Sequence, residues 1–327
     1  MSKKGKDVLT VSLRKTLEKR ERRNVTVALL VGLLVLIIGF TRLTFTGYVV
    51  ETSSCGTLST AGETYILTND ISASGTCFTI GANNIILDCA GHTITGSGAY
   101  GIVISGKSGV TIKNCKVSNF IGIYLGASSN NILTNNTVTS SSYGIYLSGA
   151  SNNIIAGNIA QGNGYGIWIA NGALNNTITN NIANSNSYGI WIHDGLNEII
   201  TNNIANSNSY GIQLIWHSNN NSIINNTANS NTNYGIGLDR YVGYDCDNSY
   251  NTFTNNIAND NRIGIYFNCG RNNTLRKNNV LYNREGGIYL INSNTSRIYT
   301  NNIYNNSGYK VWSDQPIELS YNGQGNW

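Results

Sequence analysis

The sequence predicts an all-β protein, a parallel β-helix in which about ten to eleven coils stack along one axis. The first observation is that the twelve residues Thr179–Ile190 (TNNIANSNSYGI) recur unchanged at Thr201–Ile212, 22 residues later. Two identical segments that recur at so short a period indicate an array of stacked repeats. The second observation is a Gly-Ile step that recurs at intervals of 21 to 29 residues. Its glycines are Gly101, Gly122, Gly144, Gly166, Gly189, Gly211, Gly235, Gly264 and Gly287.

The third observation is the alternation of apolar residues after each Gly-Ile step. Ile190 and Ile192 flank Trp191, and neighbouring repeats keep this spacing. A period of two residues predicts a strand, and two further short apolar segments complete each repeat. We therefore expect three short strands per coil, with successive coils about 4.8 Å apart.

The amino-terminal segment, residues 1–24, carries most of the positive charge. It holds nine Lys and Arg against three Asp and Glu, a net charge of +6. Since the whole chain has a net charge of +5, the remainder has a charge of about −1. No basic stripe remains on the repeats to neutralise phosphates, so we expect no nucleic-acid partner.

The next segment predicts a membrane anchor. Val25–Phe40 is continuously apolar, and with Thr41 it is just long enough to cross a bilayer as a helix at about 1.5 Å per residue. The positive-inside rule places residues 1–24 in the cytoplasm and the chain after Arg42 outside the cell. The alternative is a cleaved signal peptide and a secreted protein. Either interpretation exports the repeats, with residues 42–54 as a linker.

The six cysteines fit an oxidising compartment. An even number of cysteines in an exported chain indicates disulfides, and pairing of sequence neighbours predicts three bonds. The predicted pairs are Cys55 with Cys77, Cys89 with Cys115, and Cys246 with Cys269. Residues 55–80 lack the later asparagine motif, which indicates an amino-terminal capping coil for a β-helix over 55–327, closed by a second cap over 310–327.

One asparagine per repeat begins the third apolar segment. A side-chain amide has a donor and an acceptor, so identical asparagines one coil apart can form a hydrogen-bonded ladder inside the fold. We predict this ladder at Asn136, Asn158, Asn181, Asn203, Asn226, Asn256, Asn279 and Asn302. Tyrosines that precede the Gly-Ile steps predict a second, structural stack at a turn, at Tyr100, Tyr143, Tyr165, Tyr188, Tyr210 and Tyr234.

Three stretches connect the sequence to a known family. Asn83–Gly96 (NNIILDCAGHTITG), Gly109–Val117 (GVTIKNCKV) and Asn322–Trp327 (NGQGNW) resemble the right-handed parallel β-helix repeats of the pectate-lyase-like superfamily, and especially its NosD-like archaeal surface proteins. The resemblance covers about Cys55 to Trp327 and implies a right-handed helix. It does not select an activity, because the superfamily includes lyases, epimerases, hydrolases, adhesins and structural proteins.

An outward column on the first strand of each repeat is the candidate ligand-binding face. The residue after each Gly-Ile step reads Val103, Tyr124, Tyr146, Trp168, Trp191, Gln213, Gly237, Tyr266 and Tyr289 along the chain. Consecutive exposed aromatic rings with a polar rim suit sugar rings. The alternative is that the rings only reinforce strand pairing, by about 0.2–1 kcal/mol per pair. We predict ligand contacts from Tyr124, Tyr146, Trp168, Trp191, Trp216 and Arg240.

Polar residues gather where these strands end. The candidate catalytic residues are His193, Asp194, His217, Asp239, Asp245 and Asp247. The last two belong to the one sizeable insertion of the chain, Asp239–Tyr250. In enzymes of the resembling superfamily, carboxylates and basic residues on such a face abstract a proton from a uronate, sometimes with calcium. Calcium is thus the one cofactor that the resemblance suggests, and the residues themselves indicate no metal site. The alternative is a polar surface loop anchored by a disulfide.

The sequence thus favours a membrane-anchored extracellular β-helix that binds glycans or has a structural or adhesive role at the cell surface. The alternative is a polysaccharide lyase, C5-epimerase or hydrolase with its site around His193 to Asp247. Surface glycosylation is a further expectation. The seven sequons of the predicted extracellular part begin at Asn135, Asn175, Asn220, Asn225, Asn272, Asn294 and Asn305.

Overall fold

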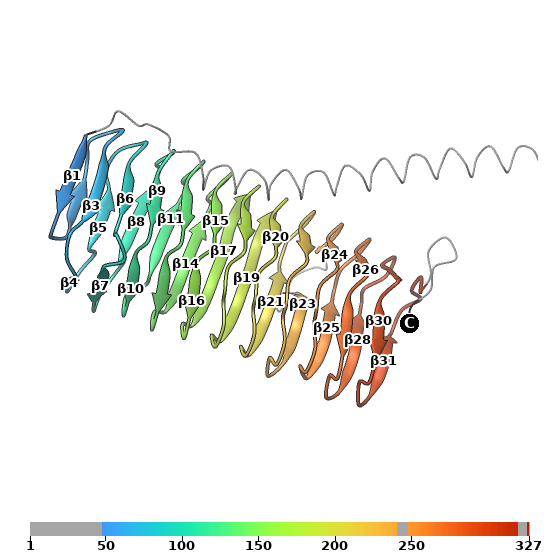
Figure 1. Ribbon diagram of the computed structural model, residues 1–327. Helices are drawn as coiled ribbons and strands as arrows, with labels where there is room; N and C mark the ends of the chain where they lie inside the picture. The colour runs from blue at the N-terminus through green and yellow to red at the C-terminus, as the bar shows by residue number, and fades with distance from the viewer. Residues whose placement is uncertain (1–47, 241–247, 320–325, 327) are drawn as a thin grey trace, which may run out of the picture. The chain divides into compact units, whose positions relative to one another are not determined.

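The computed structural model describes residues 48–240, 248–319 and 326, and they form a parallel β-helix of about 11 turns (Figure 1). All pairings between the named strands are parallel, and each coil pairs with the coils before and after it. Nothing in the described ranges forms a helix long and apolar enough to cross a membrane. The predicted basic segment, residues 1–24, and the predicted anchor, residues 25–41, lie outside the described residues.

The first of the two large sheets, sheet A, has 12 strands, one from each successive coil. They are β1 (Val49–Thr52), β3 (Thr64–Leu67), β6 (Ile86–Asp88), β9 (Thr111–Lys113), β12 (Ile132–Thr134), β15 (Ile154–Ala156), β18 (Thr177–Thr179), β20 (Ile199–Thr201), β22 (Ser222–Ile224), β24 (Thr252–Thr254), β26 (Thr274–Arg276) and β29 (Arg297–Tyr299). Strand β1 falls within the predicted linker, residues 42–54, and it pairs with β3. The helix therefore begins before Cys55.

The second large sheet, sheet B, also has 12 strands and contains the Gly-Ile steps. They are β2 (Gly56–Leu58), β5 (Phe78–Ile80), β8 (Ile102–Ser105), β11 (Ile123–Gly126), β14 (Tyr143–Ser148), β17 (Tyr165–Leu174), β19 (Tyr188–Leu196), β21 (Tyr210–Ile215), β23 (Tyr234–Asp239), β25 (Ile263–Asn268), β28 (Gly286–Ile291) and β31 (Tyr309–Ser313). Strand β31 lies in the predicted carboxyl-terminal cap and continues sheet B without a break.

The third sheet, sheet C, is less regular than predicted. It is continuous over β4 (Ile71–Ala73), β7 (Thr93–Gly96), β10 (Lys116–Ser118), β13 (Thr137–Thr139) and β16 (Ile159–Gln161), and it resumes in β27 (Asn279–Leu281) and β30 (Asn302–Tyr304). Between them the coils are joined by single bridges, such as Ile182 to Ile204. The prediction of three strands per coil thus holds at both ends of the helix and not in its middle.

The core consists of inward side chains stacked in register from coil to coil. Ile167, Ile190 and Ile212 pair in succession across β17, β19 and β21, and all three are fully buried. Burial of one such side chain stabilises the fold by about 1.5–3 kcal/mol relative to leaving it in water. The alternation in the sequence therefore becomes a continuous apolar column.

The predicted asparagine ladder is present between sheets A and C. From Asn136 to Asn256 each side-chain oxygen accepts hydrogen bonds from the coil before it, with Asn136 Nδ2 donating to Asn158 Oδ1 at 3.0 Å. The ladder then continues through Asn278, Asn301 and Asn326. The prediction of Asn279 and Asn302 was wrong by one residue, because both begin strands of sheet C.

Two further ladders occupy the other corners of each coil. One runs between sheets B and A through Asn131, Asn153, Asn176, Glu198, Asn221, Asn251 and Asn273. The other runs between sheets C and B through Asn163, Asn186, Asn208, Asn231, Asn261, Asn283 and Asn306. Where all three ladders are present, from about Asn163 onward, their side chains satisfy buried backbone groups at the three corners, and all of these side chains are amides except Glu198.

The first coils are held by disulfides and by a polar network. The predicted bonds Cys55–Cys77 and Cys89–Cys115 are confirmed. Cys269 is also disulfide-bonded, and Cys246, its predicted partner, lies outside the described residues.

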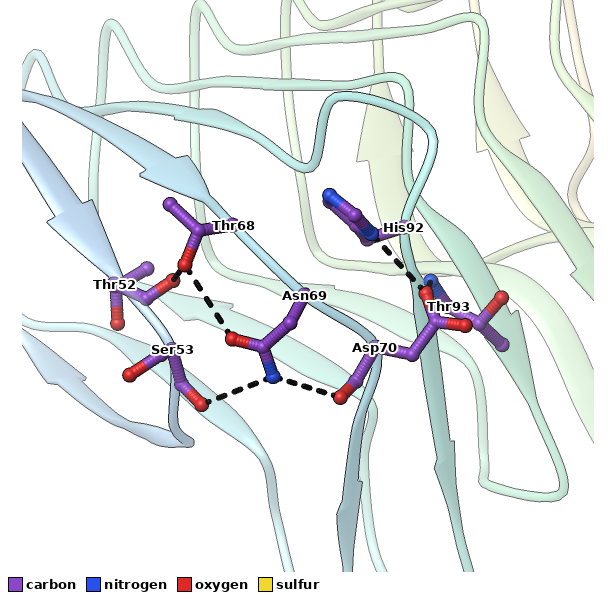
Figure 2. A network of polar contacts seen from close by, with 7 residues as sticks. All are labelled: Thr52, Ser53, Thr68, Asn69, Asp70, His92 and Thr93. Atoms are coloured by element: carbon purple, nitrogen blue, oxygen red, sulfur yellow. Dashed lines mark hydrogen bonds and ion pairs between the residues drawn. The ribbon is translucent and has the colours of Figure 1, made fainter.

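Figure 2 shows the polar network of the first coils, where Asp70 Oδ1 accepts the Thr93 N–H at 2.8 Å and lies 3.2 Å from His92 Nδ1. These hydrogen bonds lower the pKa of Asp70. In the same network, Asn69 Nδ2 donates to the carbonyl oxygen of Ser53 in the preceding coil. His92, the first of the three histidines of the chain, therefore connects amino-terminal coils, away from His193 and His217.

Candidate functional site

The candidate site is built on the outward face of sheet B. The predicted column is in register there, since Tyr124 pairs with Tyr146, Tyr146 with Trp168, and Trp168 with Trp191. The next two strands place Gln213 and then Gly237 in the same column. The column resumes with Tyr266, Tyr289 and Trp312.

The tyrosines that precede the Gly-Ile steps stack beside this column, as predicted. Tyr165 lies 4.8 Å from Tyr188 with 13° between the ring planes, and Tyr188 lies 5.1 Å from Tyr210 with 8°. The two columns interlock, because Tyr165 also stacks on Trp168 at 5.0 Å. We call this double column, from Tyr100 to Trp312 on sheet B, the aromatic ribbon.

Within the ribbon most ring faces cover one another. Tyr146 and Trp168 lie 4.4 Å apart with only 11° between their planes, and Tyr289 and Trp312 lie 4.3 Å apart with 10°. Because the rings stack from coil to coil, the stacked faces point along the axis of the helix. The ribbon therefore presents mainly ring edges and tyrosine hydroxyl groups to solvent.

Within the ribbon, the column that follows the Gly-Ile steps is interrupted at Trp191, Gln213 and Gly237, which we call the seam. Trp191 is turned by 67° from Tyr188 and by 76° from Tyr165. Gln213 is only 2% exposed, and its Oε1 is buried with no hydrogen-bond partner. A Cβ on Gly237 would lie 2.0 Å from this oxygen, so the glutamine side chain occupies the place of the missing side chain. The seam therefore divides the column that follows the Gly-Ile steps, while the tyrosine column continues past it from Tyr188 to Tyr210 and Tyr234.

The candidate polar residues lie beside the seam, two positions further along the strands. His193 pairs with Ile215, and Ile215 pairs with Asp239. His193 and Asp239 are thus two coil steps apart, about 10 Å at the usual strand spacing, with an apolar side chain between them. The structure places them on one face but not next to each other.

Asp239 is held by two hydrogen bonds. Its Oδ1 accepts the Arg240 N–H and the Asn268 side-chain amide, both at 2.8 Å. Burial raises the pKa of Asp239, although these two hydrogen bonds act in the opposite direction. Burial and the neighbouring Asp239 also raise the pKa of the Tyr266 hydroxyl. Asn268, which the sequence analysis missed, is therefore part of this site, and its place two residues after Tyr266 is the signal that could have found it.

A cluster of aromatic and imidazole rings closes the end of these strands. His193 lies 5.0 Å from Trp216, and Trp216 stacks on His217 at 4.8 Å. Trp216 and His217 both have positive φ angles, of 40° and 52°. Burial lowers the pKa of His193, while the negative charge of Asp194 opposes this shift. The neutral imidazole is therefore favoured at His193.

Two residues of the predicted site are not among the residues that the structure describes. Asp245 and Asp247 lie outside the described residues. Across residues 48–240, 248–319 and 326, no group of three or more His, Cys, Asp or Glu could hold a metal ion. The roles predicted for the candidate binding and catalytic residues stay predictions.

One buried carboxyl group was not expected from the sequence. Glu198 occupies an asparagine position of the ladder between sheets B and A and is 0% exposed. It accepts hydrogen bonds from Asn176 N at 3.0 Å and Asn176 Nδ2 at 3.1 Å. Burial raises its pKa to about 8. Its position directly after Asn197, which has a positive φ like the residues before other ladder asparagines, is the signal that was overlooked.

The family follows from the repeats along almost the whole chain. A family model described as a right-handed β-helix region matches residues 36–199, 195–307 and 244–324. The chain belongs to this family. No curated protein sequence matches it significantly.

Three solved structures illustrate the likeness of fold. A variant of the periplasmic alginate epimerase AlgG is 16% identical with a TM-score of 0.63, over 84% of this chain and 75% of that one. The catalytic domain of a GH87 α-1,3-glucanase in complex with tetrasaccharides is 16% identical with a TM-score of 0.61, over 86% and 64%. The Streptococcus pneumoniae surface protein and adhesin PfbA is 13% identical with a TM-score of 0.60, over 84% and 90%. At these identities the likeness shows the fold alone.

Proposed function

We propose that this protein is a membrane-anchored extracellular β-helix that binds glycans along the outward face of sheet B. The observation that supports this most is the aromatic ribbon. Ring edges and tyrosine hydroxyl groups repeat along it at the spacing of the coils, which suits the alternating apolar and hydroxyl surfaces of a polysaccharide chain. Such a strip is larger than strand pairing alone requires, so a binding role accounts for it better than a purely structural one.

The comparisons agree with a carbohydrate-related role. The names of the similar structures include an epimerase of alginate, a glucanase bound to tetrasaccharides and an adhesin. These proteins share the fold of this chain and differ in what they do. Two of the three names print a carbohydrate, so they support a carbohydrate-related role and do not choose among the activities.

The test is a glycan array probed with the full-length chain in mild detergent. Replacement of Trp168 and Trp191 together by Ala should lower binding at least about tenfold, because stacking and edge contacts are both lost. Tyr304→Ala is the matched control, since Tyr304 is an exposed aromatic residue of sheet C, 39% exposed, outside the ribbon. Equal binding by the double variant and the wild type would reject the ribbon as a glycan site.

A polysaccharide lyase, epimerase or hydrolase is the second candidate. The feature that favours it is the pair His193 and Asp239 on the face that carries the ribbon, with shifted pKa values. Incubation with acidic and neutral polysaccharides, followed by detection of unsaturated or reducing ends and of inverted uronates, tests it. An activity that survives in the His193→Ala and Asp239→Asn variants would exclude this pair as the catalytic residues.

The extracellular location is supported by the two confirmed disulfides, which persist in oxidising compartments. The apolar segment Val25–Thr41 after a basic amino terminus supports a retained anchor with the amino terminus in the cytoplasm. Membrane fractionation with amino-terminal sequencing distinguishes the anchor from a cleaved signal peptide. A mature protein that begins after residue 41 and is found in the medium would replace the anchor with secretion.

Surface glycosylation is part of the same proposal. The asparagines of all seven sequons are exposed, and six of them have positive φ angles at turns between sheets. These six are Asn135, Asn175, Asn220, Asn225, Asn272 and Asn305. Mass spectrometry of the protein purified from its own cells tests this, and unmodified peptides at all seven sites would reject it.

A further inference from the structure

The direction of the Trp191 ring distinguishes it from the stacked rings around it. The faces of Tyr188 are covered by Tyr165 on one side and by Tyr210 on the other, with interplanar angles of 13° and 8°. Tyr188 therefore meets Trp191 with its edge, at a centroid distance of 4.1 Å and an angle of 67°. The edge of Tyr165 approaches the same indole at 6.0 Å and 76°.

This geometry covers one face of Trp191 and turns the other away from the tyrosines. The tyrosine column lies before Trp191 along β19, and His193 lies two residues after Trp191 on the same side of the sheet. The ring contacts of Trp191 within the ribbon are those with the edges of Tyr165 and Tyr188. A half-buried indole with one face clear of its stack is the arrangement that stacks against the apolar side of a sugar ring.

The charges of sheet B indicate which class of sugar fits. Among the described strands of this sheet, the charged residues are Asp194, Asp239 and Lys310. Asp194 belongs to β19 and Asp239 to β23, which are the two outer strands of the seam. Lys310 belongs to β31, which lies three strands beyond β23. Arg240 directly follows Asp239, so two carboxylates and one guanidinium belong to the described residues next to the seam. Recognition of a polyuronate needs a row of cations to offset its carboxylates, and among these described residues the carboxylates outnumber the cations.

We propose that the second face of Trp191 is a subsite for one pyranose ring of a neutral glycan, and that polyuronates are disfavoured there. This inference rests on the proposed function and narrows it to one ligand class and one position. The sugar ring stacks on the indole, and its hydroxyl groups face the polar side chains His193 and Asp239 beside the seam. The remainder of the glycan follows the ribbon along the axis of the helix.

The experiment compares each neutral oligosaccharide with its own oxidised form. Glucan, mannan and galactan oligosaccharides are titrated into the full-length chain in mild detergent, before and after oxidation of the C6 hydroxymethyl groups to carboxylates. We expect the neutral forms to bind and the oxidised forms to bind at least about tenfold more weakly. Trp191→Ala should weaken binding about tenfold or more.

Two variants serve as controls for Trp191→Ala. Trp191→Phe retains an aromatic face and should keep most of the binding, which separates lost stacking from a lost fold. Trp168→Ala removes the same residue type from the neighbouring coil, where the ring face is covered by Tyr146, and should weaken binding by less than about threefold. The thermal midpoint of each variant is measured alongside.

The outcomes separate this inference from the function on which it rests. If the oxidised forms bind as well as the neutral ones, or if Trp168→Ala and Trp191→Ala weaken binding equally, the subsite or its ligand class is wrong while glycan binding stands. If no oligosaccharide binds to the wild-type chain, the proposed function itself is rejected.

Discussion

The interior asparagine ladders and the exterior aromatic ribbon repeat on the same coils, yet they differ in how strictly they repeat. The ladder between sheets A and C keeps asparagine in every coil from Asn136 to Asn301. The ribbon changes twice in succession, at Gln213 and Gly237. A ladder residue bonds to the coils on both sides and has no access to water, so its replacement leaves several buried polar groups unpaired.

A ribbon residue is much less constrained. An aromatic pair contributes only about 0.5–1.5 kcal/mol beyond its buried area, so an outward position can change at small cost. Departures from the repeat on the outside of the helix are therefore more informative about function than departures inside it. Glu198 is the interior exception and calls for a different explanation from the seam.

The largest expected effect comes from the removal of one ladder asparagine. Asn203 Nδ2 donates to Ile178 O, Thr201 O and Asn226 Oδ1, and Asn203 Oδ1 accepts two hydrogen bonds from Asn181. Asn203→Ala should lower the free energy of unfolding by about 5 kcal/mol, since these buried partners lose their bonds together. Denaturant unfolding of the full-length chain measures it.

The control for this prediction is the residue directly before it in the chain. Asn202 is exposed and has a φ of 56°, so Asn202→Gly removes an asparagine without a conformational penalty. It should change stability by less than about 1 kcal/mol. Similar losses from the two variants would show that the ladder adds little to stability.

The next effect concerns Glu198 and pH. Its pKa in the folded chain is about 8, against 4.5 in the unfolded chain, so the folded state holds a proton that the unfolded state has released between these values. Stability should therefore be highest below pH 4.5, fall as the pH rises toward 8, and level off above it, by a total on the order of 4 kcal/mol.

The Glu198→Gln variant isolates this contribution. Glutamine keeps the shape of the side chain and carries no charge, so the pH-dependent loss between pH 5 and 8 should largely disappear. Unfolding midpoints of both proteins across this range are the measurement. Parallel curves for the two proteins would mean that Glu198 does not control the pH dependence.

A smaller effect is expected where the ribbon is interrupted. Gly237→Ala places a Cβ 2.0 Å from Gln213 Oε1, so the glutamine side chain has to move. Because the obstacle is the end of a flexible side chain, the cost should be about 1–3 kcal/mol. The matched change Gly56→Ala tests ordinary glycine loss in another strand of sheet B, β2, where no atom lies within 4 Å of the new Cβ. Equal losses from both would mean that the seam is not tightly packed.

The smallest expected effect comes from Gln213 itself. Its buried Oε1 has no hydrogen-bond partner, so Gln213→Leu removes an unpaired polar atom at nearly constant volume. Stability should rise by about 1 kcal/mol, as an increase in the thermal midpoint. A fall of the same size would indicate that the amide makes a favourable contribution that the static geometry does not contain.

The one-residue error in the ladder shows where reading the sequence reaches its limit. In most coils two asparagines are adjacent, the first at a turn with positive φ and the second in the ladder, as in Asn202 and Asn203. Lys277 takes the turn position in a later coil, with a φ of 56°. The first asparagine of the next pair, Asn278, therefore enters the ladder, and Asn279 starts a strand. When the residue at the turn is not asparagine, the sequence alone does not show which of the two following asparagines belongs to the ladder and which begins the strand.

The sequence by itself determined the coil repeat, the inward and outward alternation on sheet B, two disulfides and most of one ladder. These features follow from patterns of polarity and hydrogen bonding that each repeat carries locally. Only the tertiary structure decided the direction of the Trp191 ring, the burial of Glu198 and the separation of His193 from Asp239 by Ile215. Each of these depends on which side chains of neighbouring coils touch, and that is fixed only when the coils stack in register.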